Sequence, residues 1–382
     1  LELDGGRGNQ APDGTDWPDN HRRFALLSWA AARLASAATP LAWRPDILHC
    51  NDWQTALAPA YLTFFARSDA ASVMTIHNLA FQGIFPPEVL TDLGLPPESF
   101  SMHGVEYYGS VSFLKAGLYY ADRLTTVSPT YAREIQQEPL GFGLHGLLAS
   151  RAGDLVGILN GIDPEVWNPA TDPNLARRYD ADRLDAKAEN KRALQNDLSL
   201  DPDPDALLLG AVSRLTHQKG LDLLLDIVPE LSEHSIQLAL LGSGEAELEA
   251  GFLEVARRRP GRIAVRIGYD EALSHRIEAG ADAFVMPSRF EPCGLNQMYS
   301  QRYGTPPIVA NTGGLADSVS DGVTGFVCLA ERDSLREAVL RAERLFRDRD
   351  AWRRLQRNGM ARDFGWELSA RRYIELFEAV CR

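Results

Sequence analysis

Strand-length apolar runs alternate with helix-length segments along nearly the whole chain, and this alternation constrains the fold more than any other feature. Runs such as ASVMTIHN, LLLGAVSRL and IQLALLGSGE are largely apolar and lack the polar–apolar alternation of a half-exposed strand. Strands of that kind are buried on both faces, as in a parallel sheet covered by helices. We therefore expect an α/β fold built from doubly wound parallel sheets.

The strands fall into two series. The first has four candidates, from PDILHCND to DLVGILNG, and the second has six, from LLLGAVSRL to TGFVCLA, a full Rossmann-like complement. We predict an N-terminal domain over residues 1–165, a C-terminal domain over residues 166–360, and a terminal segment, 361–382, with an amphipathic helix that could pack on either domain. Because the first series is short and its opening residues, LELDGGRGNQAPDGTDWPDN, read as a polar loop, we expect the chain to start inside a longer protein.

Composition excludes several classes of function. The 382 residues carry a net charge of -13 with no basic stripe, which argues against a nucleic-acid partner. The four cysteines are scattered, without a C-x-x-C pair, so the sequence indicates neither a zinc site nor a disulfide framework. No stretch has the length and apolarity of a membrane span, and we expect a cytoplasmic protein with no membrane partner.

Polar residues and glycines follow the strands, and this is where parallel sheets bind ligands, because the carboxyl ends of the strands meet at one edge. Eight such groups stand at strand ends and could converge on one crevice. In chain order they are Asn51 with Asp52, His77 with Asn78, Asn160 with Gly161, Ser213 and Arg214 with Lys219, Gly242–Gly244, Gly268 with Tyr269, Arg289–Gly294, and Thr312–Gly314.

Two cations and three glycine-containing turns suit a phosphate group. In SRLTHQKG, Arg214 and Lys219 could reach one diphosphate, since arginine offers a planar fork and lysine a point charge. The turns LGSGE, NTGGLAD and EPCGLNQ precede probable helices, whose free N–H groups favour anions. The alternatives remain open: solvated surface charges for the first pair, and tight strand-to-helix turns for the glycines.

An acid stands between a buried strand and a helix start in ADAFVMPSRFEPCGLNQ. Beside two cations and a helix N-terminus, Glu291 can stay charged and face a developing positive charge on a substrate or bind its hydroxyl groups. It could equally stabilise the start of its own helix. Three other candidates also have purely structural interpretations: His77 could be a core histidine, Asp52 a helix cap, and Cys293 a small residue in a tight turn.

The candidate metal motif is Asp201-Pro202-Asp203-Pro204-Asp205, which precedes a strand and carries prolines typical of an exposed linker. We interpret it as a loop and expect neither a metal nor another cofactor. Negative charge on a leaving phosphate would then be neutralised by arginine, lysine and helix dipoles.

Several long segments resemble the bacterial glycogen synthase family, which is related to starch synthases. They are HNLAFQG, SFLKAGLYYADRLTTVSPTYAREI, SRLTHQKGLDLL and PSRFEPCGLNQMYSQRYGTPPIV with NTGGLADSV. The resemblance implies a GT-B fold, with two Rossmann-like domains facing a cleft, of which the N-terminal, acceptor-side domain is incomplete here. It also implies metal-independent transfer of glucose from ADP-glucose to the non-reducing end of an α-1,4-glucan such as glycogen, with retention of configuration.

The resemblance also implies roles for individual residues. Glu291 corresponds to the active-site glutamate, Arg214 and Lys219 would hold the diphosphate, and His77 would lie against the donor glucose. Asp52 and Asn160 would lie near the sugar or the acceptor. The last helix would cross back onto the first domain. The remaining substrate-binding residues are expected to be Gly161, Tyr269 stacked on adenine, Cys293, Gly294, Leu295, Asn296, Thr312, Gly313 and Gly314.

Two departures from the family pattern leave alternatives open. The opening strand and Lys-x-Gly-Gly loop are absent from this sequence, and Asn311 stands where a basic residue is expected before Thr312. One alternative is another GT-B transferase with a small sugar or lipid acceptor. The other is a truncated chain that binds ADP or glucan without turnover.

Overall fold

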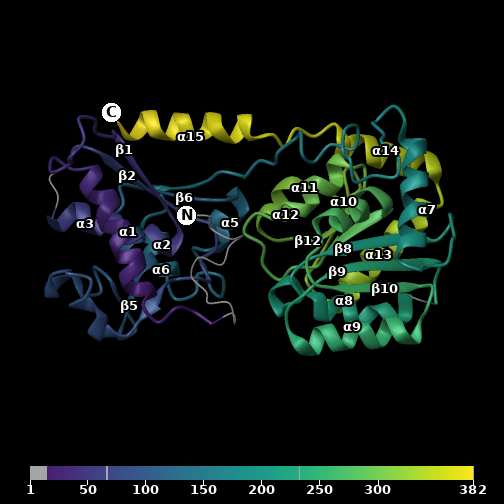
Figure 1. Ribbon diagram of the computed structural model, residues 1–382, viewed down its shortest axis with the longest axis horizontal. Coiled ribbons are helices and arrows are strands. Elements are labelled where there is room, and N and C mark those ends of the chain that lie inside the picture. The colour runs from purple at the N-terminus through teal and green to yellow at the C-terminus, as the bar shows by residue number, and fades with distance from the viewer. Residues whose placement is uncertain (1–14, 66–67, 232, 382) are drawn as a thin grey trace. The chain divides into compact units, whose positions relative to one another are not determined.

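The computed structural model describes residues 15–65, 68–231 and 233–381. Its internal contacts divide the chain into two compact units, which we treat separately. The first unit holds the described residues up to Ile158 and those from Arg371 on, and the second holds residues 159–370. Each has its own parallel sheet (Figure 1). Residues 1–14 of the predicted N-terminal loop lie outside the described residues.

The second unit contains the six predicted strands, which form one sheet in the order β10-β9-β8-β11-β12-β13, with every neighbouring pair parallel. The expected doubly wound sheet is therefore confirmed. All seven residues of the strand Ile236–Gly242 are buried, which explains why its sequence is apolar throughout. The bounds are β8 Leu207–Val212, β9 Ile236–Gly242, β10 Ile263–Ile267, β11 Ala283–Met286, β12 Pro307–Ala310 and β13 Phe326–Cys328.

Helices cover both faces of this sheet (Figure 1). One face is covered by α8 (Leu221–Leu231), α9 (Ala246–Arg258) and α13 (Arg332–Phe346). The other carries α7 (Lys187–Asp197), α10 (Glu271–Gly280), α11 (Asn296–Arg302) and α12 (Gly313–Ser318), with α14 (Arg349–Met360) beside α11 and α13.

The strand order reverses its direction between β8 and β11. From β8 the chain proceeds outward to β9 and β10, and it then returns across the sheet to continue through β11, β12 and β13. The loops that leave β8 and β11 thus border a topological switch point, the usual ligand-binding position in an open parallel sheet.

The first unit has a smaller parallel sheet in the order β1-β2-β6-β7, and these are the four strands predicted for it. The strands are β1 (Ile47–Asn51), β2 (Ala71–Ile76), β6 (Arg123–Thr126) and β7 (Leu155–Gly157). The accompanying helices are α1 (Asn20–Leu34), α2 (Asp52–Thr55), α3 (Leu57–Phe65), α4 (Phe113–Tyr120), α5 (Pro129–Glu134) and α6 (His145–Ser150).

A small antiparallel sheet in the first unit was not predicted. Its strands are β3 (Ile84–Phe85), β4 (Glu106–Tyr107) and β5 (Ser110–Ser112), in the order β3-β5-β4. Strands of two or three residues are too short to show a periodic pattern, so sequence analysis had no signal for them.

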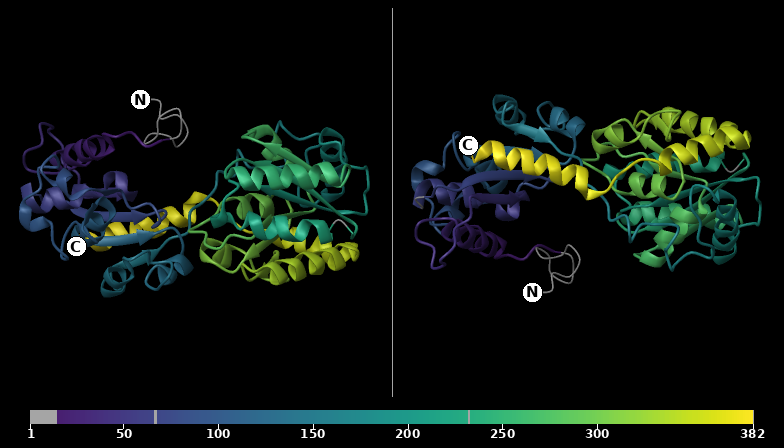
Figure 2. Two further views of the ribbon diagram at one scale, coloured as in Figure 1. Left: turned by 90° about the horizontal axis from the view of Figure 1, so that it is seen from below. Right: turned by 90° about the horizontal axis from the view of Figure 1, so that it is seen from above.

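The final helix α15 (Trp366–Val380) begins in the second unit and ends in the first. Within the first unit, the rings of Tyr373 and Phe377 lie 5.6 and 5.5 Å from the ring of His49 in β1, and Figure 2 shows this half of the helix beside the sheet. Within the second unit, Ile162 N donates to Phe364 O at 2.8 Å, so the segments before α15 and after Leu159 lie side by side.

Candidate active site

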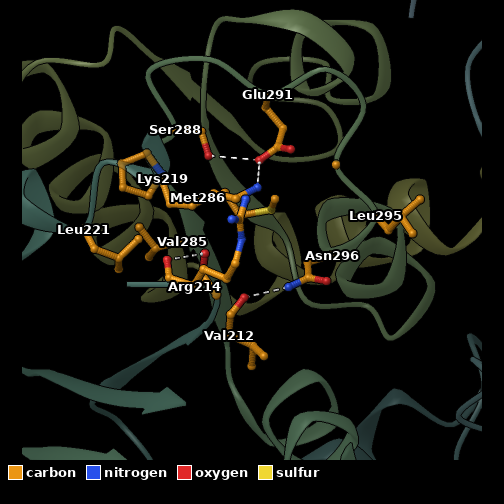
Figure 3. A pocket seen from close by; sticks show the side chains of 13 residues that line it. Val212, Arg214, Lys219, Leu221, Val285, Met286, Ser288, Glu291, Leu295 and Asn296 are labelled. Atoms are coloured by element: carbon orange, nitrogen blue, oxygen red, sulfur yellow. Dashed lines mark hydrogen bonds and ion pairs between the residues drawn. The ribbon is translucent and has the colours of Figure 1, made fainter. Parts of the chain in front are cut away.

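A pocket of about 360 Å³ opens between the loops that follow β8 and β11, at the switch point of the second sheet (Figure 3). Arg214, Lys219 and Glu291, three residues predicted to act together, all line it. The other lining residues are Val212, Ser213, Leu221, Val285, Met286, Pro287, Ser288, Gly294, Leu295 and Asn296.

Glu291 is a buried acid with a defined set of partners. Its residue exposure is 5%, and Lys219 Nζ lies 2.5 Å from its Oε2. Ser288 Oγ donates to the same oxygen at 3.1 Å, as Figure 3 shows. A buried carboxylate needs such compensation to remain charged. No hydrogen bond to Oε1 is found among the described residues, which leaves that oxygen available to a ligand.

Arg214 extends into the pocket from the end of β8 (Figure 3). Over the described ranges, its guanidinium makes no hydrogen bond or ion pair. An arginine that lines a pocket but is not paired with a protein carboxylate keeps its five N–H donors for an incoming anion.

Glycine and proline set the positions of the two loops. Pro287 ends β11, and Gly220 follows the turn that carries Lys219 with φ of +65°. A Cβ atom on Gly220 would lie 2.0 Å from Pro287 O, so only glycine allows the two loops to approach this closely. This approach brings Lys219 within reach of Glu291.

The glycine pair before α12 packs against the loop that carries Glu291. Gly314 N donates to Glu291 O at 3.1 Å and to Pro292 O at 3.2 Å. The structure thus uses this N–H group to hold the Glu291 loop, whereas the resemblance implied that it contacts sugar or phosphate. Thr312 is buried beside the pair.

We expect Gly313→Ala to disturb the Glu291 loop. Gly313 has φ of +43°, and an added Cβ would lie 1.9 Å from Glu291 O. Gly322→Ala is the matched control, because Gly322 also has positive φ, +69°, but a Cβ added there would have nothing within 4 Å. Thermal unfolding should show Gly313→Ala to be less stable than Gly322→Ala by about 1–3 kcal/mol. Equal losses would contradict this role of Gly313.

The turn after Glu291 is built mainly by internal bonds. Gln297 Nε2 donates to Cys293 O at 3.1 Å and Gly294 O at 2.9 Å. Asn296 Nδ2 donates to Val212 O at 2.7 Å and thereby ties α11 to β8. Burial raises the pKa of the Cys293 thiol to about 12, and a hydrogen bond with the Asn160 backbone opposes this only partly. Cys293 is therefore a neutral, packed residue of the turn.

Two predicted residues, Asp52 and His77, lie in the first unit, at the carboxyl ends of β1 and β2. Asp52 Oδ1 accepts from His77 N at 2.7 Å, and His77 Nε2 lies 2.9 Å from Asn51 Oδ1. Burial raises the pKa of Asp52, while His77 and the backbone N–H groups of His77 and Asn78 oppose that shift. Asp52 also has φ of +52°, a strained conformation of the kind often found at functional sites.

Gly161 and Tyr269 lie outside the pocket around Glu291. A Cβ on Gly161 would lie 2.7 Å from the backbone of Trp366, so this glycine allows the chain to pass the start of α15. Tyr269 is 85% exposed beyond β10 and lines a separate hollow, with Arg266, Asp270 and Arg276 among its neighbours.

The segment from Asp201 to Asp205 is a loop, as predicted. Asp203 Oδ1 accepts from the N–H groups of Asp205 and Ala206 at 2.9 and 3.1 Å, so its carboxylate shapes the turn into β8. Within the part of the chain that the structure describes, no three His, Cys, Asp or Glu residues form a cluster suited to a metal ion.

Sequence analysis did not predict two sets of contacts that support Glu291. Ser288 donates to its carboxylate, and Arg289 joins its loop to the turn around Lys219. Both residues follow β11 closely. Arg289 belongs to the strand-end group Arg289–Gly294 already singled out, whereas Ser288 was not named as a candidate. Nothing in the sequence indicated which partners they would meet.

The fold and the pocket define a glycosyltransferase of the GT-B class. The family model of glycosyl transferases group 1 matches residues 195–362, and that of the starch synthase catalytic domain matches residues 7–150. The catalytic domain of starch synthase IV from Arabidopsis thaliana, solved with ADP and acarbose, superposes with a TM-score of 0.88 at 34% identity. The match covers 97% of this chain and 81% of that one.

The chain belongs to the glycogen synthase family, as its motifs predicted. It is 62% identical over 381 residues to a glycogen synthase of Aromatoleum aromaticum, covering 97% of this chain and 77% of that protein. It is 56% identical over 375 residues to a glycogen synthase of Nitrosomonas europaea, covering 96% and 76%. Its activity is therefore glycogen or starch synthesis.

Among the helices of the described residues, none has both the length and the apolarity that crossing a bilayer requires.

Proposed function

We propose that this chain transfers glucose from ADP-glucose to the 4-hydroxyl at the non-reducing end of an α-1,4-glucan, with retention of configuration. The observation that carries the proposal is the pocket shared by Arg214, Lys219 and Glu291. The ADP bound to the starch synthase IV relative supports an adenine nucleotide as donor.

In the proposed reaction, the bond between the sugar C1 and the diphosphate oxygen breaks while C1 forms a bond to the acceptor oxygen. Arg214 and Lys219 stabilise the departing diphosphate, which is the largest electrostatic contribution. A diphosphate oxygen takes the proton of the acceptor hydroxyl. Because attack occurs on the side from which ADP leaves, the configuration at C1 is retained.

Glu291 then acts on the sugar. Its charge stabilises the positive character that develops at C1, and its ion pair with Lys219 compensates for the burial of that charge. We propose further that His77 contacts the donor glucose and that Asp52 and Asn160 lie near the sugar or the acceptor. The strand-end positions of Asp52 and His77 support this part of the proposal.

The proposal is tested by following glucose transfer to glycogen from ADP-glucose and UDP-glucose in parallel, with and without EDTA. We expect transfer from ADP-glucose to exceed that from UDP-glucose, to persist in EDTA, and to give a product that α-1,4-specific hydrolases degrade. Transfer to a small sugar or lipid but not to glycogen would contradict the proposal. Binding of ADP without any transfer would contradict it as well.

Tyr269 provides a test of how the adenine is bound. If its exposed ring stacks on the base, Tyr269→Ala should weaken ADP binding by about tenfold, since stacking contributes about 1–3 kcal/mol per base. Tyr269→Phe retains the ring and should bind ADP like the unsubstituted chain. Calorimetry with ADP measures both variants, and unchanged affinity in Tyr269→Ala would remove this residue from the nucleotide site.

A further inference from the structure

We propose that Arg289 is a positioning residue for the Lys219–Glu291 pair. It joins the loop after β11 to the turn after β8, and so sets the distance between the cation and the acid. The inference rests on the proposed function, in which Lys219 and Glu291 act on the donor. Arg289 lies outside the pocket lining, so its effect must pass through the residues that it holds.

The side chain of Arg289 makes a two-pronged contact with Asp222, the second residue of α8. Its Nη1 donates to Asp222 Oδ1 at 2.7 Å and its Nη2 donates to Asp222 Oδ2 at 2.6 Å. A planar fork on a carboxylate fixes orientation as well as distance, which a lysine cannot reproduce.

The same residue also holds the turn that leads to Lys219. Arg289 Nη1 donates to His217 O at 2.8 Å, and Arg289 N donates to Gln218 O at 2.9 Å. These two carbonyls immediately precede Lys219 in the chain. Arg289 itself precedes Glu291 by two residues, so one side chain and its backbone bridge the two segments that carry the ion pair.

The charges of Arg289 and Asp222 are mutually stabilised. Burial raises the pKa of Asp222, but the hydrogen bonds and charge of Arg289, together with a backbone hydrogen bond and the charge of His217, hold it below its usual value. His217 Nδ1 lies 3.7 Å from Asp222 Oδ2 and adds a further cation when protonated. The contact is thus ionic under neutral conditions, and its geometry is that of a strong pair.

Loss of the fork should therefore leave both loops folded but poorly aligned. Each loop keeps other contacts that hold it. Gly220, after Lys219, packs on Pro287, and the Glu291 carbonyl still accepts from Gly314 N. Displacements of about 1 Å at a catalytic group can reduce turnover about 100-fold. The expected signature is a fall in kcat with little change in donor binding or in stability.

The test compares Arg289→Lys and Asp222→Asn with Arg341→Lys. Arg341 is a matched control because it also makes a forked contact, with Asp321 at 2.9 and 3.1 Å, and donates to a carbonyl, Val327 O at 3.1 Å. For each variant, kcat and donor KM in transfer to glycogen, the ADP dissociation constant and the melting temperature are measured.

We expect Arg289→Lys and Asp222→Asn each to lower kcat about tenfold or more, with donor KM and ADP affinity within about threefold of normal. The double variant should be no worse than the more impaired single variant, because both disrupt one contact. Arg341→Lys should leave kcat unchanged. If the unsubstituted chain is active and Arg289→Lys matches Arg341→Lys, or if the loss merely follows the melting temperature, the inference is overturned. Absence of transfer by the unsubstituted chain would overturn the proposed function and this inference together.

Discussion

Glu291→Gln is expected to lower kcat by about 10²–10³-fold while changing donor KM by much less. Glutamine has nearly the same size but no charge, so it cannot stabilise positive character at the sugar carbon or pair with Lys219, whose Nζ lies 2.5 Å from Oε2. A group that acts mainly in the transition state affects kcat and kcat/KM together and leaves ground-state binding nearly intact. Glu291→Ala should show the same pattern.

Steady-state kinetics with ADP-glucose and glycogen measure this effect. Glu247→Gln is a suitable control, since Glu247 lies in the first turn of α9 and has no hydrogen bond among the described residues. Melting temperatures separate loss of function from loss of structure. Near-normal turnover in Glu291→Gln would show that the acid has no chemical role.

Arg214→Ala should reduce kcat/KM for the donor by about 10²-fold or more. Its guanidinium makes no hydrogen bond or ion pair within the described part of the chain, so its removal leaves no protein partner unsatisfied. The substitution removes a charged hydrogen-bond donor aimed at the diphosphate. That group would act both on the diphosphate of bound ADP-glucose and on the negative charge that develops as ADP leaves. Arg214→Lys keeps the charge but loses the fork, so its kcat/KM should lie between those of the unsubstituted chain and Arg214→Ala.

A control variant and a binding measurement show whether the loss of kcat/KM is specific to Arg214. Arg192→Ala removes an exposed arginine of α7 and should leave kcat/KM unchanged. ADP affinity of the Arg214→Ala chain, measured by calorimetry, should also fall. A variant with normal ADP affinity and normal kcat/KM would place the diphosphate away from Arg214.

Local sequence was sufficient to predict the strands of the two parallel sheets and the residues at their ends. β8 and β11 are apolar because helices cover both faces of the sheet, and the polar residues that follow them mark its ligand-binding edge. Arg214 and Glu291 were recognised as candidates from that pattern alone. Their motifs also resembled the family to which the chain belongs.

The contacts that align these candidates could not be predicted, because they depend on which strands become neighbours. Arg289 and Asp222 are 67 positions apart, and they meet only because β11 inserts beside β8. Gly313 similarly meets Glu291 O because β12 lies next to β11. From the sequence, such a glycine could only be interpreted as part of a turn or a phosphate-binding loop.

Two of the three helix N-termini expected to bind phosphate belong to short helices; only α9, after the turn LGSGE, is long, with 13 residues. α11 has seven residues and α12 has six, and Gly314 N is already engaged by Glu291 O and Pro292 O. The sequence showed where these helices begin but not how early they end. Arg214 and Lys219 therefore take a larger share of the proposed charge stabilisation than the motifs suggested.

The central claim is that Arg214 and Lys219, at the switch point of the second sheet, carry the negative charge of the leaving diphosphate. A crystal structure of the chain with ADP tests it most directly. We predict phosphate oxygens within about 3 Å of the Arg214 guanidinium and of Lys219 Nζ, beside Glu291. ADP whose phosphates lie away from both cations, with the pocket between β8 and β11 left unoccupied, would contradict the claim.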